Sequence, residues 1–343
     1  MSNNPNLEKE CLEWYAQNKE LYTACASCVH RLLTTLLEQT NTPFHSIQYR
    51  IKDQKSFLEK CMNPRYKSPL DEITDVCGLR IITYTNRDVD QICKIIEKHF
   101  SIDPENSVNK ADLLHANEVG YLSVHYIATL NQLRIELDEY KPYRNIRFEI
   151  QVRTLLQHAW AEIEHDRSYK FSGALPKELK RRFYLVAGAL ELMDREFDCL
   201  SVEIDAYAQD VKAKAQQGNL DVEVDSTSLI EYLNLRLKDV PVKQRDFLGD
   251  DKEIIEEVTL FGIRTLAQLD SLITDTLISK LNWDDSISNY IGALRAIMMA
   301  HDPDKYFSTA WRNHWTAMDK KSYAIFEKIN PAIGNHKNSL HII

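Results

Sequence analysis

The sequence predicts an α+β fold followed by a helical C-terminal extension. Segments with strand-like alternation and segments with helical spacing follow one another over residues 44–170, and beyond that range only helical spacing recurs. The clearest strand is Arg147–Arg153, where Phe148, Ile150 and Val152 share one face. That apolar face is expected to pack on a core, as one side of a sheet normally does.

The polar face of this strand is the first candidate for a functional site. Glu149 lies there between Arg147 and Arg153, with Gln151 beside it. A solvated strand face can show the same alternation. Because other segments supply charged and aromatic groups in the same alternating way, the pattern favours a functional face.

The bulk properties are those of a globular protein. The chain has 343 residues, enough for two or three domains, with 44% hydrophobic and 27% charged residues. There is no run of about eighteen apolar residues, and the N-terminus lacks the features of a signal peptide, so we expect a cytoplasmic protein without membrane contact. Its seven cysteines are irregularly spaced. The lone Cys25-x-x-Cys28 pair lies in a predicted helix, so buried free thiols are preferred to a metal or redox role.

The charge is unevenly distributed along the chain. The net charge is -9, which argues against general nucleic-acid binding. Residues Phe44 to Leu70 contain six basic and two acidic side chains (6 - 2 = +4), whereas Gln217 to Phe261 contain five and eleven (5 - 11 = -6). A local basic patch on an acidic protein predicts a compact anionic ligand.

Four domains or segments are expected: an N-terminal helix (1–43), a domain over 44–175, a long helix (176–216) and a helical C-terminal region (220–343). Within the first three we expect helices at Leu7 to about Gln39 and Asp88 to Phe100, strands at Phe44 to Ile51, Leu79 to Tyr84 and Tyr121 to Leu130, a surface loop at Ser101 to Val119 and a hairpin at Arg134 to Arg144.

A group of cations follows the first strand. Lys52, Ser56 and Lys60 are spaced at i, i+4 and i+8, so we expect them to share one face of a helix near its start, with Arg50 just before it. Ammonium groups, a hydroxyl and helix amides suit phosphate oxygens. A solvated basic face is the alternative.

The segment after Arg153 is expected to be helical. His158, Glu162 and His165 lie at i, i+4 and i+7 on one side of it. Without an H-E-x-x-H motif or a further clear ligand, bracing of the neighbouring strand is preferred to a zinc site.

The long helix that begins near Pro176 carries an apolar seam in steps of four and three. Such a seam packs against another helix, which would be either the first helix of this chain or another subunit. Its residues are Leu179, Phe183, Val186, Leu190, Met193, Phe197, Leu200 and Ile204.

Four motifs together resemble the synthetase domain of the RelA/SpoT family, in the manner of a small alarmone synthetase. They are RIKDQKSFLEK (50–60), ITDVCGLRI (73–81), GYLSVH (120–125) and EIQVRTLLQHAWAEIEH (149–165), and the resemblance extends from about Phe44 to Lys170. It implies a nucleotidyltransferase-like mixed β-sheet flanked by helices. It also implies a GTP pyrophosphokinase that moves pyrophosphate from ATP to the 3'-hydroxyl of GDP or GTP, making ppGpp or pppGpp.

The same resemblance implies residue roles. Asp75 and Glu149 match the Mg²⁺-binding carboxylates, and Glu149 also suits removal of the acceptor proton. Arg50, Lys52, Ser56 and Lys60 match the contacts to the ATP phosphates. Tyr121 matches the tyrosine that stacks on the acceptor base. The acceptor side is completed by Lys110, His125, Gln151 and Arg153, whereas Arg80 is left open between a phosphate contact and a structural ion pair.

Several features leave alternatives open. Asn117-Glu118-Val119 precede Gly120 where family members often carry a lysine, so the acceptor is either GDP/GTP or the 3' end of tRNA, as in toxic relatives. A catalytically inactive nucleotide sensor is the alternative of another class. No His-Asp and Glu-Asp pairs precede residue 44, so alarmone hydrolysis is not expected. A homo-oligomer and a regulatory protein partner bound through the C-terminal region are left open.

Overall fold

The computed structural model describes residues 5–109, 123–170, 176–247, 251–281, 287, 289–311 and 317–342. The chain divides into two compact units, Met1–Ser201 and Val202–Ile343. The division falls within one long helix, α7 (Lys177–Gln216).

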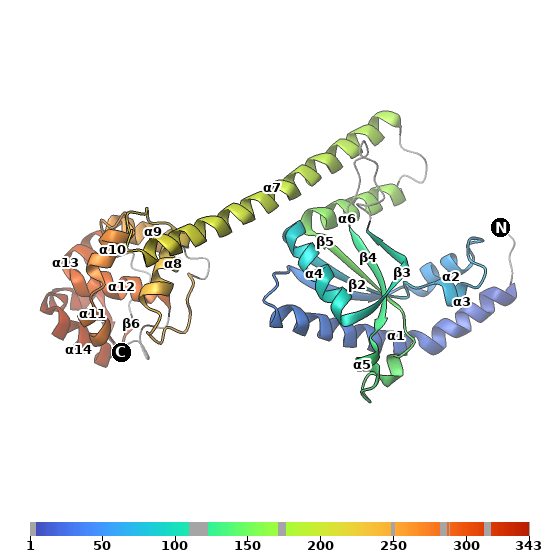
Figure 1. Ribbon diagram of the computed structural model, residues 1–343, viewed down its shortest axis with the longest axis horizontal. Helices are drawn as coiled ribbons and strands as arrows, with labels where there is room; N and C mark the ends of the chain where they lie inside the picture. Colours follow the sequence, from blue (N-terminus) through green and yellow to red (C-terminus); the bar gives the residue numbers. More distant parts are fainter. Residues whose placement is uncertain are drawn as a thin grey trace. The chain divides into compact units, whose positions relative to one another are not determined.

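A five-stranded sheet organises the first unit (Figure 1). Strand β2 runs parallel to β5, and the other neighbouring strands pair antiparallel, which confirms the expected mixed sheet. The order is β1-β2-β5-β4-β3, with bounds β1 (Ser46–Ile51), β2 (Cys77–Thr83), β3 (Phe100–Asn109), β4 (Val124–Leu130) and β5 (Phe148–Thr154). The helices around it are α1 (Pro5–Gln39), α2 (Gln54–Cys61), α3 (Pro69–Glu72), α4 (Asn86–His99), α5 (Gln132–Ile135), the short 3-10 helix η2 (Lys141–Tyr143) and α6 (Leu155–Lys170).

One face of the sheet is apolar and covered by α1 and α4. Phe148, Ile150 and Val152 of β5 are completely buried there, as their alternation predicts. Leu33 of α1 and Ile92 of α4 belong to the same core. The opposite, polar face of the sheet is therefore the one left for chemistry.

A second, smaller core fixes the segment between β1 and β2. Phe57 of α2 is fully buried and stacks on Trp14 of α1 at 5.4 Å between ring centroids. The hydroxyl of Tyr15 donates a hydrogen bond to the carbonyl of Lys52 at 2.8 Å. Because α2 is tied to α1 in this way, the basic residues that it carries are held at the end of the sheet.

Two expectations about the connecting segments are wrong. The stretch expected to be a surface loop begins with β3, an edge strand with an irregular register between Asp103 and Val108. Its polar residues reflect pairing on one side only, which a sequence pattern does not report. The expected hairpin at Arg134 to Arg144 consists instead of α5 and η2; α5 begins where the side chain of Asn131 accepts a hydrogen bond from the Arg134 amide.

The second unit is helical and has an extensive core of its own. The helical C-terminal extension predicted from the sequence is confirmed, with helices that contain Leu229, Leu266 and Ile291. Its elements are α8 (Ser226–Arg236), α9 (Asp251–Leu260), α10 (Leu266–Leu272), α11 (Asp275–Lys280), α12 (Tyr290–His301), α13 (Pro303–Lys305), the π-helix η3 (Tyr306–Ala310), α14 (Lys320–Ile329), the 3-10 helix η4 (Pro331–Ser339) and the paired strands β6 (Ala317–Met318) and β7 (His341–Ile342).

Within the described part of the chain, no helix combines the length and the apolar character needed to cross a bilayer.

Candidate active site

The register of the sheet gathers polar side chains from four strands. Gln48 pairs with Arg80, Arg80 with Gln151, and Gln151 with His125, so these four residues form one row across the sheet. Glu149 lies two residues before Gln151 on the same face of β5. The site is therefore assembled by strand pairing between segments that are far apart in the sequence.

Asp75 lies just before β2 and is held by two lysines. Its Oδ2 is 2.7 Å from Nζ of Lys60 and 3.0 Å from Nζ of Lys52. Burial alone would raise the pKa of this carboxyl, but the hydrogen bonds and charges of the two lysines outweigh burial and lower the pKa below its usual value. Asp75 is therefore ionised at neutral pH.

The prediction that Lys52, Ser56 and Lys60 share one face of a helix is wrong in one respect. Helix α2 begins at Gln54, after its N-cap Asp53, so Lys52 precedes the helix and cannot share a face with Ser56 and Lys60. Lys52 and Lys60 nevertheless converge, because the chain bends between β1 and α2 and both ammonium groups meet at Asp75.

Glu149 lies at the centre of a hydrogen-bonded chain. Its Oε1 is 2.7 Å from Nδ1 of His125, and its Oε2 accepts from Nε2 of Gln151 at 3.0 Å. The amide oxygen of Gln151 accepts in turn from Arg153 at 2.7 Å. On the other side, Nε2 of His125 is 2.7 Å from the hydroxyl of Ser123. Each group fixes the next, so the carboxylate is oriented before any ligand binds.

These bonds decide the charge of Glu149. Burial raises the pKa of the carboxyl, whereas the hydrogen bonds from His125 and Gln151 lower it, and the net result is a lowered pKa. The charge of Asp75 acts in the opposite direction and raises it. The Asp75 carboxylate is thus close enough to influence the ionisation of Glu149.

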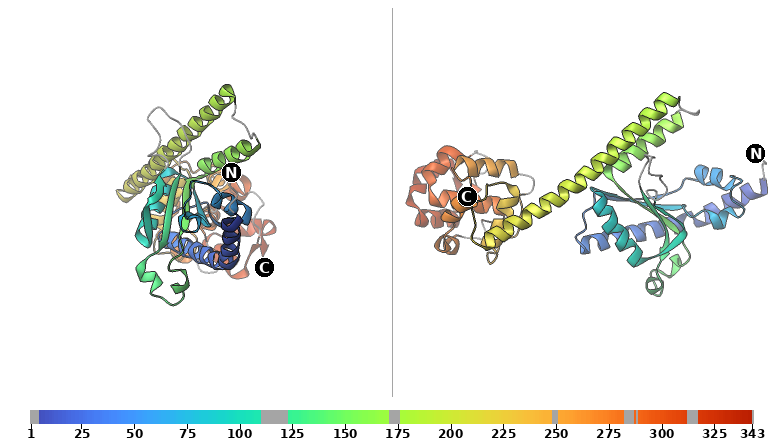
Figure 2. Two further views of the ribbon diagram at one scale, coloured as in Figure 1. Left: turned by 90° about the vertical axis from the view of Figure 1, so that its right-hand side faces the viewer. Right: turned by 45° about the horizontal axis from the view of Figure 1, so that its top comes forward.

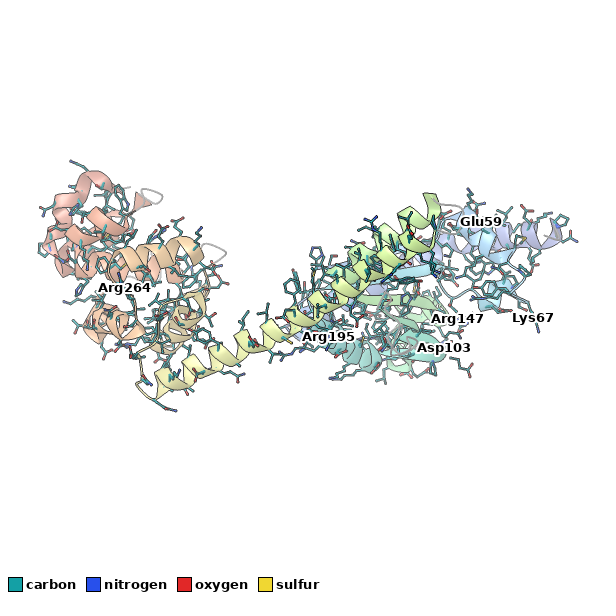
Figure 3. The ribbon with its side chains drawn as sticks, turned by 90° about the horizontal axis from the view of Figure 1, so that it is seen from above. Glu59, Lys67, Asp103, Arg147, Arg195 and Arg264 are labelled. Atoms are coloured by element: carbon teal, nitrogen blue, oxygen red, sulfur yellow. The ribbon has the colours of Figure 1, made fainter. Side chains whose placement is uncertain are left out.

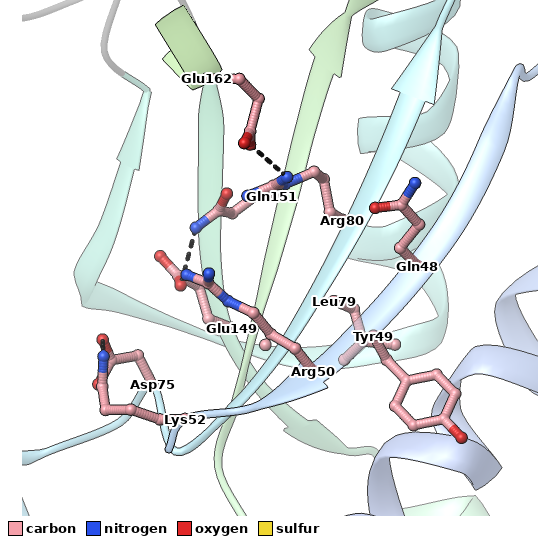
Figure 4. Close-up of a pocket in the computed structure, with 11 residues that line it drawn as sticks. Gln48, Tyr49, Arg50, Lys52, Asp75, Leu79, Arg80, Glu149, Gln151 and Glu162 are labelled. Atoms are coloured by element: carbon pink, nitrogen blue, oxygen red, sulfur yellow. Dashed lines mark hydrogen bonds and ion pairs between the residues drawn. The ribbon is translucent and has the colours of Figure 1, made fainter. Parts of the chain in front are cut away.

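Both carboxylates line one cavity (Figure 4). This cavity has a volume of about 150 Å³ and is walled mainly by polar side chains. Its lining residues are Gln48, Tyr49, Arg50, Lys52, Asp75, Gly78, Leu79, Arg80, Glu149, Gln151 and Glu162. Figure 4 shows Arg50 extending over Glu149 and the Lys52–Asp75 pair at the edge of the same space.

Arg80 is engaged by the helix that follows β5. Its guanidinium donates to Oε1 of Glu162 on α6 at 2.8 Å, and Nδ1 of His158 is 3.7 Å from the same oxygen. This is the structural ion pair that the sequence left open, although Arg80 also faces the cavity. Among the described residues no cluster of three or more metal-binding side chains occurs, and the side chain of His165 lies outside them.

The two carboxylates suit a hard divalent cation. Oδ1 of Asp75 is buried and has no hydrogen-bond partner among the residues that the structure describes, which leaves one oxygen of an ionised carboxylate available to a ligand. Oxygen ligands from one or two carboxylates together with substrate phosphates are the usual environment of Mg²⁺. Asp75 and Glu149 therefore fit the role of magnesium ligands.

The remaining predicted residues fall into four groups. Arg50, Lys52 and Gln151 line the cavity, and Lys60, His125 and Arg153 contact residues that do. Ser56 lies on α2, where its amide donates to Asp53, and it is not part of the cavity wall. Lys110 and Tyr121 lie outside the described residues.

Sequence reasoning missed Gln48 and Ser123. Gln48 precedes Arg50 by two residues, so the alternation of β1 already places both on one face. Ser123 shares a face with His125 for the same reason. Conversely, Arg147 points away from the cavity, because its guanidinium donates to the carbonyl of Asp71.

Comparison with known proteins identifies relatives of this chain. The family model described as "Region found in RelA / SpoT proteins" matches residues 49–174. The chain is 31% identical over 188 residues to the GTP pyrophosphokinase YjbM of Bacillus subtilis (strain 168), a match that covers 52% of this chain and 84% of that protein. It is 25% identical over 170 residues to the GTP pyrophosphokinase YwaC of the same organism, covering 48% and 77% respectively.

Solved structures of small alarmone synthetases are also similar. The small alarmone synthetase 1 from Bacillus subtilis bound to its product pppGpp covers 56% of this chain and 98% of that one, with 24% identity and a TM-score of 0.47. The sequence match to YjbM spans most of that protein at 31% identity. The chain therefore belongs to the RelA/SpoT family.

Proposed function

We propose that this chain is a pyrophosphokinase that transfers the β,γ-pyrophosphoryl group of ATP to the 3'-hydroxyl of GDP or GTP. The observation that carries the proposal is the placement of Asp75 and Glu149 on one cavity, each ionised and each held by named partners. The family relatives YjbM and YwaC, both named GTP pyrophosphokinases, support the same reaction.

The basic side chains at the cavity suit the triphosphate of ATP, the donor of the pyrophosphoryl group. Arg50 and Lys52 face the cavity, and Lys60 reaches it through Asp75. Triphosphate oxygens are strong acceptors for guanidinium and ammonium groups. As Lys52 and Lys60 turn from Asp75 to phosphate oxygens, the Asp75 carboxylate loses both partners and is released for a cation.

Mg²⁺, held by Asp75 and Glu149, would screen the phosphate charges that develop during transfer. The reaction itself forms a bond between the acceptor oxygen and the β-phosphorus of ATP. The bond from that phosphorus to the α-phosphate oxygen breaks, and AMP leaves with the electron pair.

Glu149 suits the general base. Its lowered pKa keeps it ionised at neutral pH, and it can accept the proton of the acceptor hydroxyl as the new bond forms. The contacts from His125 and Gln151 hold its two oxygens in place, so little reorganisation is needed. In this account Gln151 and His125 position the base rather than react.

The tRNA acceptor remains the second candidate. Arg65 lies over the ring of Tyr66 at 4.9 Å in a loop that also contains the exposed Lys67. An exposed cation and aromatic pair of this kind suits a nucleic-acid backbone and an unstacked base.

Label transfer from ATP separates these possibilities. The purified chain is incubated with Mg²⁺, ATP labelled in its γ-phosphate, and GDP, GTP or tRNA in separate reactions. Label in ppGpp or pppGpp supports the proposal. Label confined to tRNA would show that the acceptor is tRNA instead of GDP or GTP. No transfer to any acceptor rejects the proposed function in favour of a nucleotide-binding protein. The Glu149→Gln variant serves as the matched inactive control.

A further inference from the structure

The cavity of the candidate site has a third carboxylate in its wall, which the proposed reaction does not use. Asp75 and Glu149 suit the magnesium ion and the general base, whereas Glu162 lies on α6 and lines the same cavity. A carboxylate repels phosphate groups, so it weakens the binding of any triphosphate that approaches it. Its place in a triphosphate-binding cavity therefore needs a separate explanation.

The register of the sheet gives the cavity two ends. Strands β1 and β2 pair Arg50 with Gly78 and Gln48 with Arg80, so these two rows lie about 7 Å apart along the strands. Glu162 contacts the second row, because its Oε1 accepts a hydrogen bond from Arg80 at 2.8 Å. Figure 4 shows Glu162 on the far side of that row from Arg50. The cavity therefore extends along the strands from Arg50 toward Glu162.

One end of the cavity has two ammonium groups. Lys52 and Lys60 meet at Asp75 there, at 3.0 and 2.7 Å from its Oδ2. Helix α2, which carries Lys60, lies at the end of the first unit that Figure 3 marks with Glu59 and Lys67. Ammonium groups bind phosphate oxygens strongly, so in the proposed function this end takes the triphosphate of ATP.

The other end of the cavity is bounded by α6. This helix packs against α7, where Trp160 of α6 contacts Phe183 at 4.4 Å between ring centroids. Figure 2 shows α6 running beside the first half of α7. Glu162 follows Trp160 by two residues, so the packing of α6 fixes the backbone from which Glu162 reaches the cavity.

The charges at the α6 end are balanced. Arg80 and Glu162 form an ion pair. His158 lies 3.7 Å from Oε1 of Glu162, and its pKa is lowered by burial and by the positive charges of Arg153 and Arg80, so the imidazole is neutral at neutral pH. A triphosphate gains little at such an end, whereas an uncharged nucleobase with polar edges fits it.

One oxygen of Glu162 is placed to contact such a base. Its contacts within the described part of the chain go to Oε1, so Oε2 is the oxygen left for a ligand. A carboxylate accepts hydrogen bonds and donates none. Adenine has a donating amino group at C6, whereas guanine and hypoxanthine have a carbonyl oxygen there. Guanine could offer its N1–H and 2-amino group together only to a carboxylate with both oxygens available, and Oε1 is already engaged by Arg80.

We propose that Glu162 determines the specificity for the donor, by accepting a hydrogen bond from the 6-amino group of ATP at Oε2. The inference rests on the proposed function, because that function places the ATP phosphates at Lys52 and Lys60. It adds the contact that distinguishes ATP from other purine triphosphates. The ion pair with Arg80 holds the Glu162 side chain in position for this contact.

Equilibrium binding measures this contact without any reaction. The full chain, with Mg²⁺ and no acceptor, is titrated with ATP, with purine riboside triphosphate, which lacks the 6-amino group, and with ITP, which has an oxygen there. ATP is expected to bind about tenfold more tightly than purine riboside triphosphate, because one hydrogen bond to a charged acceptor is lost. ITP is expected to bind about a hundredfold more weakly than ATP, because two acceptors then face each other. Equal affinities for ATP and purine riboside triphosphate would overturn the proposal.

Two substitutions assign the preference to Glu162. Glu162→Ala is expected to bind ATP and purine riboside triphosphate equally tightly. If Glu162 acts only by holding Arg80, both triphosphates lose the same factor and the tenfold preference remains, which would contradict the proposal. Glu162→Gln is expected to bind ITP about tenfold more tightly than the wild type does, since the amide can donate to O6.

Glu164→Ala is the matched control. Glu164 is exposed on the same helix and does not line the cavity, so this variant should keep the wild-type preference for ATP. Loss of the preference in Glu164→Ala would show that the charge of α6 matters rather than the contact at Glu162. Circular dichroism checks that all three variants are folded.

Turnover separates this inference from the proposed function. GDP labelled in its guanine is incubated with each donor, and formation of ppGpp gives kcat/KM for ATP and for purine riboside triphosphate. A chain that binds ATP with the expected preference and makes no ppGpp would reject the proposed function and support the role of Glu162. A chain that makes ppGpp equally well from both donors would support the function and overturn the role of Glu162.

Discussion

The ammonium group of Lys60 lies 2.7 Å from Oδ2 of Asp75, so a predicted phosphate-binding cation is paired with a predicted magnesium ligand. Without a nucleotide, the two groups neutralise each other, and Lys52 adds a second contact at 3.0 Å. A phosphate that recruits the lysines therefore frees the carboxylate, and donor binding and cation binding are expected to support each other.

Removing one of these lysines tests that relationship. Lys60→Met is expected to raise the KM for ATP about ten- to a hundredfold, because a charge-assisted contact to phosphate is lost. The matched control is Lys55→Met, which removes an equal charge from an exposed position on the same helix. Initial rates at varied ATP concentration measure both. Equal effects of the two substitutions would mean that Lys60 contributes only to the general charge.

Glu149→Gln tests the general base. The substitution keeps the size of the side chain and removes the charge, so kcat is expected to fall about a hundred- to ten-thousandfold. The melting temperature should change by only a few degrees, because the amide can keep a hydrogen bond within the chain of Gln151 and His125. Glu164→Gln on α6, an exposed position, is the control. Near wild-type kcat in Glu149→Gln would exclude a catalytic role.

The pH dependence of the reaction should follow the contact between His125 and Glu149. Glu149 acts in its ionised form, and the hydrogen bond from His125 helps to keep its pKa low. Removing that bond in His125→Ala raises the pKa of Glu149, so the acidic limb of the kcat/KM profile moves to higher pH. Ser123→Ala, which leaves the Glu149 contact in place, should move the limb less. A larger shift in Ser123→Ala would contradict this order of effects.

The stability of the folded chain should depend on pH through Asp194, a carboxylate outside the candidate active site. Asp194 on α7 is 2% exposed, accepts a hydrogen bond from Thr154 at 2.7 Å, and has one oxygen without a partner among the described residues. Burial raises its pKa from 3.8 to about 6. The folded state therefore binds this proton more tightly than the unfolded chain, and stability from this group is lost as the pH rises through about 6.

Asp194→Asn removes that dependence. The asparagine keeps an acceptor for Thr154 and needs no charge, so the variant should melt a few degrees above the wild type at pH 8. The difference should shrink as the pH is lowered toward 4. Asp90→Asn, at an exposed position on α4, is the control. A difference in melting temperature that is constant across pH would show that Asp194 titrates normally.

Strand alternation predicted which side chains of β5 share a face. The pattern at β5 placed Glu149 and Gln151 on the face opposite Phe148 and Ile150, and the structure confirms it. Alternation is a local property of the chain, so the sequence reports it directly. The register between strands is not local. The row that joins Gln48, Arg80, Gln151 and His125 emerged only from the pairing.

The failures have a common cause in tertiary contacts. Lys52 and Lys60 converge on Asp75 although they do not share a helix, because the core around Phe57 fixes the bend between them. Strand β3 is polar and irregular in sequence, and it becomes a strand through pairing with β4. The seam of α7 correctly predicted a helix with an apolar face. The face of α7 that packs on the first unit is set by contacts with Thr154 and Trp160. The periodicity of the α7 sequence does not reveal these contacts.

The stoichiometry of AMP release tests the central claim most directly. With ATP carrying different labels in its α- and γ-phosphates, the account predicts one AMP retaining the α label for every acceptor that gains the γ label, and an acceptor heavier by two phosphates. Release of ADP with an acceptor heavier by one phosphate, or AMP formation without a modified acceptor, would contradict pyrophosphoryl transfer at this site.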